Sequence, residues 1–224
     1  MRGVLATPTT PRYLWTAAAG RVRHQAGWGP GGILRLADDL PQPQLPDAPG
    51  WVRVRPELSG VCGSDLGLAH AKISFVLSAI YRSERIIPGH EMVAVVTETG
   101  PGATEVSEGD RVVVNPLMSC AQRGFDPMCA TCASGFPHLC ERLDEAGVID
   151  CTAPAAGFAE AVGGGWGEQV VAHQSQLYRV GDIPSRRAVL AEPASIGLHA
   201  ALRWRRAGDR AVVTGRSRLF QRSG

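Results

Sequence analysis

The chain has 224 residues, of which 44% are hydrophobic and 20% charged, so its composition excludes wholesale disorder. No apolar run approaches the ~18 residues of a membrane span, and the N-terminus, with an early proline and arginine, does not resemble a signal peptide. We therefore expect a cytoplasmic protein with no membrane partner. The 27 glycines and 16 prolines favour many turns and short strands over a helix bundle.

The formal net charge is only +2, but the basic residues are unevenly placed. Residues 203–224 hold seven arginines and one acidic residue, Asp209. A basic tail of this kind suggests nucleic-acid binding. The tail has no regular aromatic interleaving and contains no recognisable reading module, so we expect no nucleic-acid partner.

Short strands are predicted through most of the chain. Residues 1–30 show no clear hydrophobic period, and the apolar patterns after them predict strands at residues 32–38, 51–55, 91–99, 111–115 and 168–172. Residues 116–150 form a long irregular region that contains four of the six cysteines. A loop this long without a core of its own usually needs a function or a covalent or metal staple.

The pattern changes near Pro193, which suits the first turn of a helix. Ile196, Ala200 and Trp204 recur every four residues, and a buried strand is predicted over residues 210–215. The sequence thus predicts a β-rich domain over residues 1–192 and the start of an α/β domain over residues 193–224.

The cysteine-rich region contains Cys120, Cys129, Cys132 and Cys140, with a C-x-x-C pair at its centre. Four thiolates at such spacing can enclose one tetrahedral zinc ion, which gives a structural site with no open position. Two alternatives stay open: a disulfide framework, which the absence of a secretory signal disfavours, and a redox-active C-x-x-C, which normally belongs to a thioredoxin-like unit.

A second group of metal-binding residue types is spread along the chain. Cys62 begins the string Cys-Gly-Ser-Asp, His90 and Glu91 end Pro-Gly-His-Glu, and Glu192 stands in Ala-Glu-Pro. A thiolate, an imidazole and a carboxylate from separate segments suit a catalytic zinc ion with a free coordination position. Taken singly, a buried cysteine or histidine is more often a packing residue, and Asp65 could equally cap a short helix beginning near Ser64.

Four strings carry a family resemblance. Gly-Val-Cys-Gly-Ser-Asp-Leu, Pro-Gly-His-Glu, Gly-Asp-Arg-Val and Ala-Glu-Pro-Ala-Ser-Ile-Gly-Leu-His-Ala occur in this order around the four-cysteine lobe. Together they resemble the zinc-dependent medium-chain alcohol dehydrogenases, in particular the sorbitol and threonine dehydrogenase branch, over residues 50–214. The resemblance implies a mainly β fold with some α: a GroES-like β-barrel catalytic domain followed by a Rossmann domain that binds NAD or NADP.

The resemblance also implies roles for single residues. Cys62 and His90 match catalytic zinc ligands, Glu91 matches a carboxylate that binds the metal in some relatives, and Glu192 matches a ligand that acts directly or through water. Ser64 matches the hydroxyl that relays the alcohol proton, and Asp65 matches the carboxylate that orients the zinc-binding histidine. Gly63 and Gly215 match cofactor-binding positions. An alcohol or polyol would be the substrate, and a homo-oligomer is usual in the family.

Two departures from the family pattern are visible. Cys120 stands nine residues before Cys129, where the family has a tight pair, so Asp126 is an alternative fourth ligand of the structural zinc. After Gly215 the sequence Arg-Ser-Arg-Leu-Phe-Gln lacks the next two glycines of the dinucleotide-binding turn. Only Lys72 among the 23 basic residues is lysine, which suggests a GC-rich gene. Because the family match stops within the motif and the residues after it are rich in arginine and serine, we expect that the reading frame changes near Gly215. The chain would then be a truncated, inactive catalytic-domain fragment.

Three functional classes remain at this level. The first is a zinc-dependent alcohol or polyol dehydrogenase. The second is a non-catalytic zinc-binding β module. The third is a zinc-independent relative of the quinone reductases, which the cysteine lobe and the ligand residues disfavour. The substrate, the choice between NAD and NADP, and the oligomeric state are not fixed by these residues.

Overall fold

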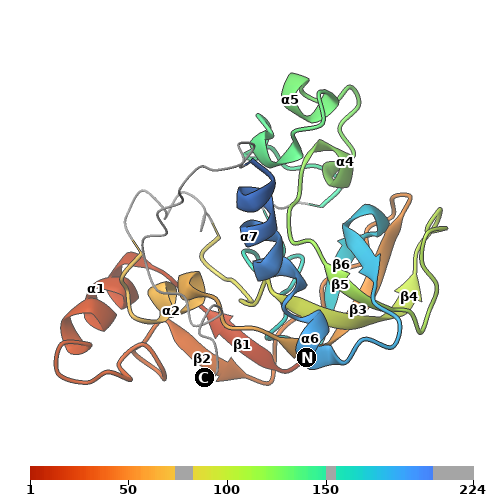
Figure 1. Cartoon of the computed structure of the whole chain (residues 1–224). Helices are drawn as coiled ribbons and strands as arrows, with labels where there is room; N and C mark the ends of the chain where they lie inside the picture. The colour runs from red at the N-terminus through yellow and green to blue at the C-terminus, as the bar shows by residue number, and fades with distance from the viewer. Residues whose placement is uncertain (74–82, 150–154, 204–224) are drawn as a thin grey trace.

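The computed structural model describes residues 1–73, 83–149 and 155–203, and its strands form two antiparallel sheets (Figure 1). The small sheet pairs β1 (Gly3–Ala6) with β2 (Leu34–Ala37). The larger sheet has the order β6-β3-β4-β5-β7. Its strands are β3 (Trp51–Ser59), β4 (Met92–Thr99), β5 (Arg111–Val114), β6 (Val170–His173) and β7 (Leu177–Arg179). The mainly β fold with some helices is confirmed.

The main core lies on one face of the larger sheet. Alternate residues of β4 and β5 point into it, which is the period of two expected for half-buried strands. Its fully buried members include Val52 and Val54 on β3, Ala94 and Val96 on β4, and Val112 on β5. The five strands predicted from the apolar patterns are all present, with ends that differ by a few residues.

The N-terminal region contains structure that the sequence did not predict. β1 is followed by helix α1 (Thr10–Ala19), and residues 7–33 connect β1 to β2. A proline in the first turn of α1, preceded by Thr9 at the N-cap position, was the local signal for this helix. The run of alanines at its end gave no hydrophobic period, so the helix was missed.

The cysteine-rich region stands apart from the sheets as a lobe, drawn in green at the top of Figure 1. Residues 116–150 were expected to be irregular, but they contain short helical segments: α4 (Cys120–Arg123), α5 (Ala130–Ala133) and η1 (Pro137–Leu139). The lobe also has a small core, in which Phe125 and Leu143 pack against the cysteines.

The other helical segments lie beside the larger sheet or between strands. They are α2 (Gly63–Ala69), η2 (Gln174–Gln176), α6 (Ser185–Ala188) and α7 (Ala191–Arg203). Helix α7 begins two residues before Pro193 and runs towards the lobe, where the His199 ring centroid is 6.2 Å from that of His138 (Figure 1). Trp204 and the strand predicted over residues 210–215 lie outside the described residues.

None of the described helices has both the length and the apolar character required to cross a bilayer.

Candidate metal centres

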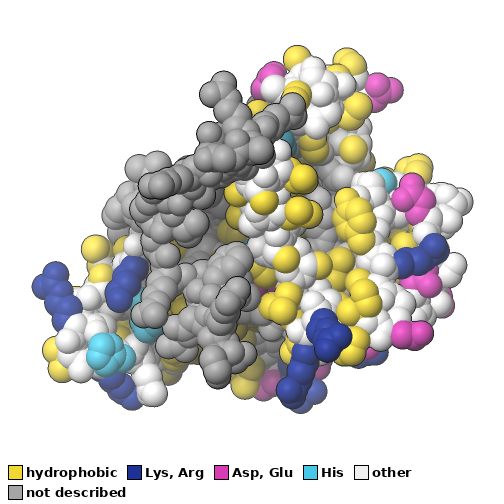
Figure 2. Space-filling model, viewed as in Figure 1, with side chains coloured by type: hydrophobic (Ala, Val, Ile, Leu, Met, Phe, Trp, Pro, Cys, Tyr) yellow, Lys and Arg dark blue, Asp and Glu magenta, His cyan; other side chains and the backbone are white. Residues whose placement is uncertain are grey.

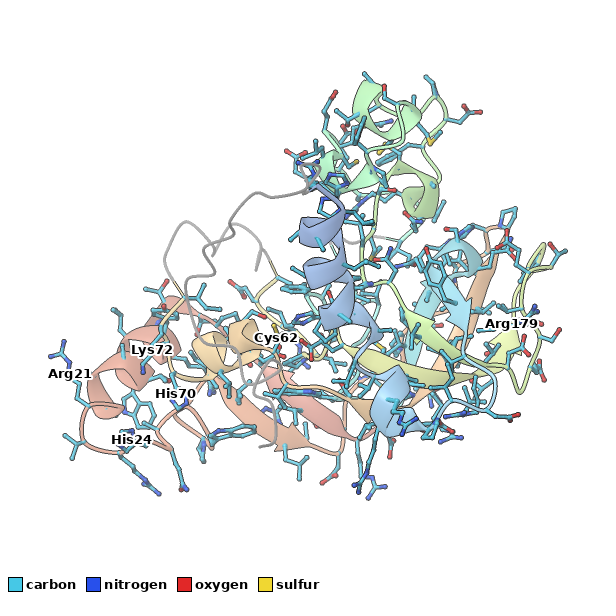
Figure 3. All side chains as sticks on the ribbon, in the orientation of Figure 1. Arg21, His24, Cys62, His70, Lys72 and Arg179 are labelled. Atoms are coloured by element: carbon cyan, nitrogen blue, oxygen red, sulfur yellow. The ribbon has the colours of Figure 1, made fainter. Side chains whose placement is uncertain are left out.

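Cys62, His90 and Glu91 form the first candidate metal centre. One ligand atom from each lies within 4.8 Å of the other two. Cys62 occupies the N-cap position of α2, and His90 and Glu91 directly precede β4. Figure 3 shows Cys62 at the centre of the molecule, at the start of α2 and beside the sheet. Two segments that are distant in sequence, one carrying Cys62 and the other carrying His90 and Glu91, are therefore brought to one point.

The end of β3 and the start of β4 hold these segments together. Ser59 is paired with Met92 in the ladder, and the Gly60 N–H donates to the Glu91 carbonyl at 2.8 Å. The Ser59 hydroxyl donates to the same carbonyl at 3.0 Å. The Trp166 indole N–H donates to the Gly60 carbonyl at 3.1 Å. These hydrogen bonds fix the backbone at residues 59–60, just before Cys62, and at residues 91–92, just after His90.

Asp65 is buried and contacts both sides of the group. One carboxylate oxygen accepts a hydrogen bond from the Cys62 N–H at 2.9 Å, and the other lies 3.8 Å from Nδ1 of His90. Burial raises the pKa of Asp65, while the Cys62 N–H and a charge on His90 oppose that rise. The sequence left two interpretations of Asp65, as a helix cap and as the carboxylate that orients His90. In the structure its side chain caps α2 and also faces His90.

The chemistry of the three donors fits a zinc ion. The His90 ring is buried, and its Nδ1 has no hydrogen-bond partner among the described residues. Because Nδ1 faces the Asp65 carboxylate at 3.8 Å, the other ring nitrogen is the one that would bind a metal, and a small movement of the ring towards Asp65 would relieve the cost of the unpaired Nδ1. Thiolate sulfur, imidazole nitrogen and carboxylate oxygen are the donors that zinc takes in proteins.

Glu192 lies near this group without belonging to it. It is half-buried in the first turn of α7, and burial raises the pKa of its carboxyl. The charge of Glu91 adds to the rise and that of His90 opposes it, so Glu192 is within electrostatic range of both. The structure thus groups three of the four residues suggested by the sequence and leaves the fourth at the edge.

Phe158 is a member of the site that sequence reasoning missed. Its ring centroid is 5.3 Å from that of His90, with the two planes tilted by 40°. The aromatic ring therefore packs beside the imidazole. No motif marked Phe158, and only the folded chain shows its position.

The four lobe cysteines form the second candidate centre, and their sulfur atoms all lie within 4.8 Å of one another. The Sγ atoms of Cys120 and Cys140 are 3.6 Å apart, well beyond the ~2.05 Å of a disulfide. The group includes Cys120, whereas the exposed Asp126 is not part of it. The long spacing before Cys129 therefore does not prevent Cys120 from joining the cluster.

The surroundings of the lobe thiols differ from one cysteine to the next. A hydrogen bond from the Thr131 hydroxyl lowers the pKa of Cys129 to about 6. Burial raises the pKa of Cys132 to about 12 and also raises that of Cys120. Cys120 and Cys132 therefore resist ionisation, and a bound cation would reverse this by stabilising their thiolates.

Comparison with protein families identifies the fold that carries these centres. The alcohol dehydrogenase GroES-like domain family matches residues 48–182, which include the three-residue group and the whole lobe. The chain belongs to this family.

Proteins similar to this chain are named as dehydrogenases or as alcohol dehydrogenase-like proteins. The chain is 32% identical over 155 residues to a D-altritol 5-dehydrogenase of Agrobacterium fabrum, covering 69% of this chain and 38% of that protein. It is 32% identical over 184 residues to an uncharacterised zinc-type alcohol dehydrogenase-like protein of Haemophilus influenzae, covering 80% of this chain and 46% of that one. Galactitol-1-phosphate dehydrogenase from Escherichia coli has the same fold, with a TM-score of 0.59, 23% identity, and coverage of 89% of this chain and 44% of that one.

These proteins are longer than the present chain, which spans less than half the length of each. Gly63, at the start of α2, is placed by the structure beside the Cys62 group, but Gly215 lies outside the described residues. The matched family region ends within residues 1–192, so the domain boundary at residue 193 stays a prediction.

Proposed function

We propose that this chain is the metal-binding catalytic part of a zinc-dependent dehydrogenase that oxidises an alcohol or polyol with NAD or NADP. The observation that supports this most is the convergence of Cys62, His90 and Glu91 in a protein of the GroES-like alcohol dehydrogenase family. The relative named for D-altritol, a polyol, favours a polyhydroxylated substrate.

In this proposal the two candidate centres have different tasks. Cys62, His90 and Glu91 would hold a catalytic zinc ion, with Glu192 as a further carboxylate that reaches it directly or through water. The four lobe cysteines would hold a structural zinc ion. Three protein ligands leave a coordination position for substrate, whereas four thiolates leave none. A zinc ion in the first centre supplies a Lewis acid, which favours loss of the proton from an alcohol hydroxyl.

The remaining residues of the site would handle the substrate and its proton. The Ser64 hydroxyl is buried in the first turn of α2 and has no hydrogen-bond partner among the described residues, so it is free to accept one from an alcohol. Asp65 would keep the His90 ring in place. Phe158 would exclude water beside it, which strengthens electrostatic interactions in the site.

Hydride transfer requires the nicotinamide cofactor, since the redox step is performed by the cofactor. Gly63 and Gly215 are the positions of this chain proposed to approach it. The sequence after Gly215 lacks the next two glycines of the dinucleotide-binding turn, which favours a second candidate function, a zinc-binding β module without turnover. We further propose a cytoplasmic location and a homo-oligomeric state, as in the family.

Metal substitution of the full chain tests the proposal. Cobalt in place of zinc gives visible absorption bands that report thiolate ligation and tetrahedral geometry. We expect two cobalt ions per chain, with the bands of only one changing when a polyol is added. Cys62→Ser should remove that responsive ion and leave the other. A chain that binds no metal through Cys62 would overturn the assignment.

A coupled assay then separates the two candidate functions. Production of NADH or NADPH from a polyol by the metal-loaded chain would establish the dehydrogenase. A responsive metal centre with no nucleotide reduction would support the module without turnover.

A further inference from the structure

The connection between β1 and β2 is far longer than the fold requires. The two strands pair residue by residue, from Gly3 opposite Ala37 to Ala6 opposite Leu34. A two-residue turn can join such an antiparallel pair. Instead residues 7–33, here called the α1 connection, leave the sheet and return to it. This connection lies outside the region matched by the family.

The α1 connection is held to the body of the domain on its inner side. The Arg12 guanidinium donates to the carbonyls of Pro30 and Gly32 at 2.9 and 2.6 Å, which closes the connection on itself. The Tyr13 hydroxyl donates to the Ile73 carbonyl, and Ile33 is buried with Leu68 of α2. The outer side is therefore presented in a fixed shape.

That outer side is apolar. Leu14, Ala18 and Val22 are spaced by four, which places them on one face of α1 and the turn that continues it. Leu14 is 59% and Val22 93% exposed, and two tryptophans lie in the same connection, Trp15 at 47% and Trp28 at 49% exposed. Large apolar side chains exposed together mark an interaction surface.

The same segment is strongly basic. Residues 1–37 contain five arginines and no acidic residue, whereas residues 38–203 contain 12 basic and 20 acidic residues. Arg21, Arg23 and His24 are exposed, and none of their side chains has a hydrogen bond or ion pair among the described residues. Figure 3 shows Arg21 and His24 at the outer edge of the molecule, pointing away from the larger sheet.

We propose that the α1 connection binds the surface of an anionic lipid bilayer, so that this domain is a peripheral membrane protein. Arginine guanidinium groups pair with phosphate headgroups, and tryptophan and leucine side chains enter the interfacial layer below them. The connection forms an outer edge of the molecule on which hydrophobic and basic side chains stand together (Figures 1 and 2).

The proposal is independent of the metal centres and of the proposed enzyme. It departs from the sequence-based expectation of no membrane partner, which considered spanning segments and leader peptides only. A surface helix needs neither of them, and its exposed face becomes visible only once the connection is folded.

Vesicle flotation with the zinc-loaded full chain tests the proposal. We expect binding to phosphatidylcholine vesicles that contain phosphatidylserine, little binding to phosphatidylcholine alone, and a blue shift of tryptophan fluorescence on binding. The double variant R21E/R23E should lower the partition roughly 30-fold or more, since each basic residue near an anionic surface contributes about a factor of five. Val22→Ser tests the apolar part with one exposed substitution, and it should weaken binding several-fold.

The matched control is R186E/R187E on α6, which makes the same charge change at two exposed arginines elsewhere. It should bind vesicles like the parent chain. Equal loss in this control would overturn the proposal, as would equal binding to both vesicle types or complete competition by millimolar inorganic phosphate. Binding to duplex DNA in preference to vesicles, or self-association that R21E/R23E abolishes, would assign the surface to another partner. Zinc content of every variant confirms that it is folded.

Discussion

Asp65 and His90 meet through a carboxylate oxygen and Nδ1 that are 3.8 Å apart. The other oxygen of the same carboxylate accepts from the Cys62 backbone N–H at 2.9 Å. One buried acid therefore lies against both the cysteine segment and the histidine segment, with a hydrogen bond to the first and a gap of 3.8 Å to the second.

This connection predicts that Asp65→Asn weakens metal binding without unfolding the domain. The asparagine side-chain oxygen can still accept from Cys62, but the negative charge beside His90 is lost. We expect the affinity of the Cys62 centre for zinc to fall about 10- to 100-fold, measured by competition with a chromogenic chelator.

The matched control for this variant is Asp110→Asn. Asp110 accepts from the N–H of Ser107 at 2.8 Å, the same three-residue arrangement as in Asp65, but it lies at the β4–β5 turn. The zinc affinity of the Asp110→Asn variant should match that of the parent chain. An unchanged affinity in Asp65→Asn would show that the carboxylate does not support His90.

Gly89 immediately precedes His90 and has a φ of +93°. A Cβ at this position would lie 2.6 Å from Cδ1 of Trp166 and 2.8 Å from Oγ of Ser59. Gly109 has a similar φ of +88° and no atom within 4 Å of the corresponding Cβ. Both alanine variants therefore carry the same backbone penalty of about 1–2 kcal/mol, but only Gly89→Ala adds a collision.

We expect urea unfolding to show a larger loss of stability for Gly89→Ala, by about 1–3 kcal/mol over Gly109→Ala. Metal analysis should show reduced zinc at the Cys62 centre only in Gly89→Ala, since the collision displaces His90. Equal stability and zinc content in the two variants would mean that the backbone at Gly89 adjusts freely.

Two substitutions in the lobe should differ in their effect on zinc content. Cys132→Ser removes a thiolate from the four-cysteine group, so the zinc content should fall by one ion per chain and the lobe should become sensitive to protease. Asp126→Asn changes an exposed residue outside the group and should leave the zinc content unchanged. Loss of zinc in Asp126→Asn would identify that carboxylate as a ligand.

His173 predicts a pH dependence of stability. Its Nδ1 accepts from the Ser175 N–H at 3.2 Å, and burial against Trp51 disfavours the imidazolium form, so the pKa of His173 is lowered. Above the ordinary pKa of ~6.5 the imidazole is neutral in both states and the effect is absent. As the pH falls below that value, the unfolded chain takes up the proton first, and stability decreases until the folded chain is protonated too.

The measurement is urea unfolding at about pH 7.5 and about pH 5.5, for the parent chain and for His173→Asn. Asparagine can accept the same hydrogen bond but does not titrate. The parent chain should lose more stability between the two pH values than the variant does. Equal losses in both would mean that His173 titrates normally.

The sequence by itself determined the strands β2 to β6, the two groups of metal-binding residue types and the family. Strands with alternating apolar residues, such as Trp51–Val54, carry their period in the chain itself, and the strings around Cys62 and His90 are specific in combination. Helix α1 could not be predicted in the same way, because its alanine-rich end has no polar face and its stability comes from contacts with Ile33 and Ile73 in distant segments.

Only the tertiary structure decided which residues meet. It selected Cys120 over Asp126 in the lobe, left Glu192 beside rather than within the Cys62 group, and placed Phe158 on the His90 ring. The reason is physical: residue type and spacing restrict which ligands are available, but distances between segments are set by sheet register, by the Ser59–Met92 pairing and by the packing of loops that carry no local pattern.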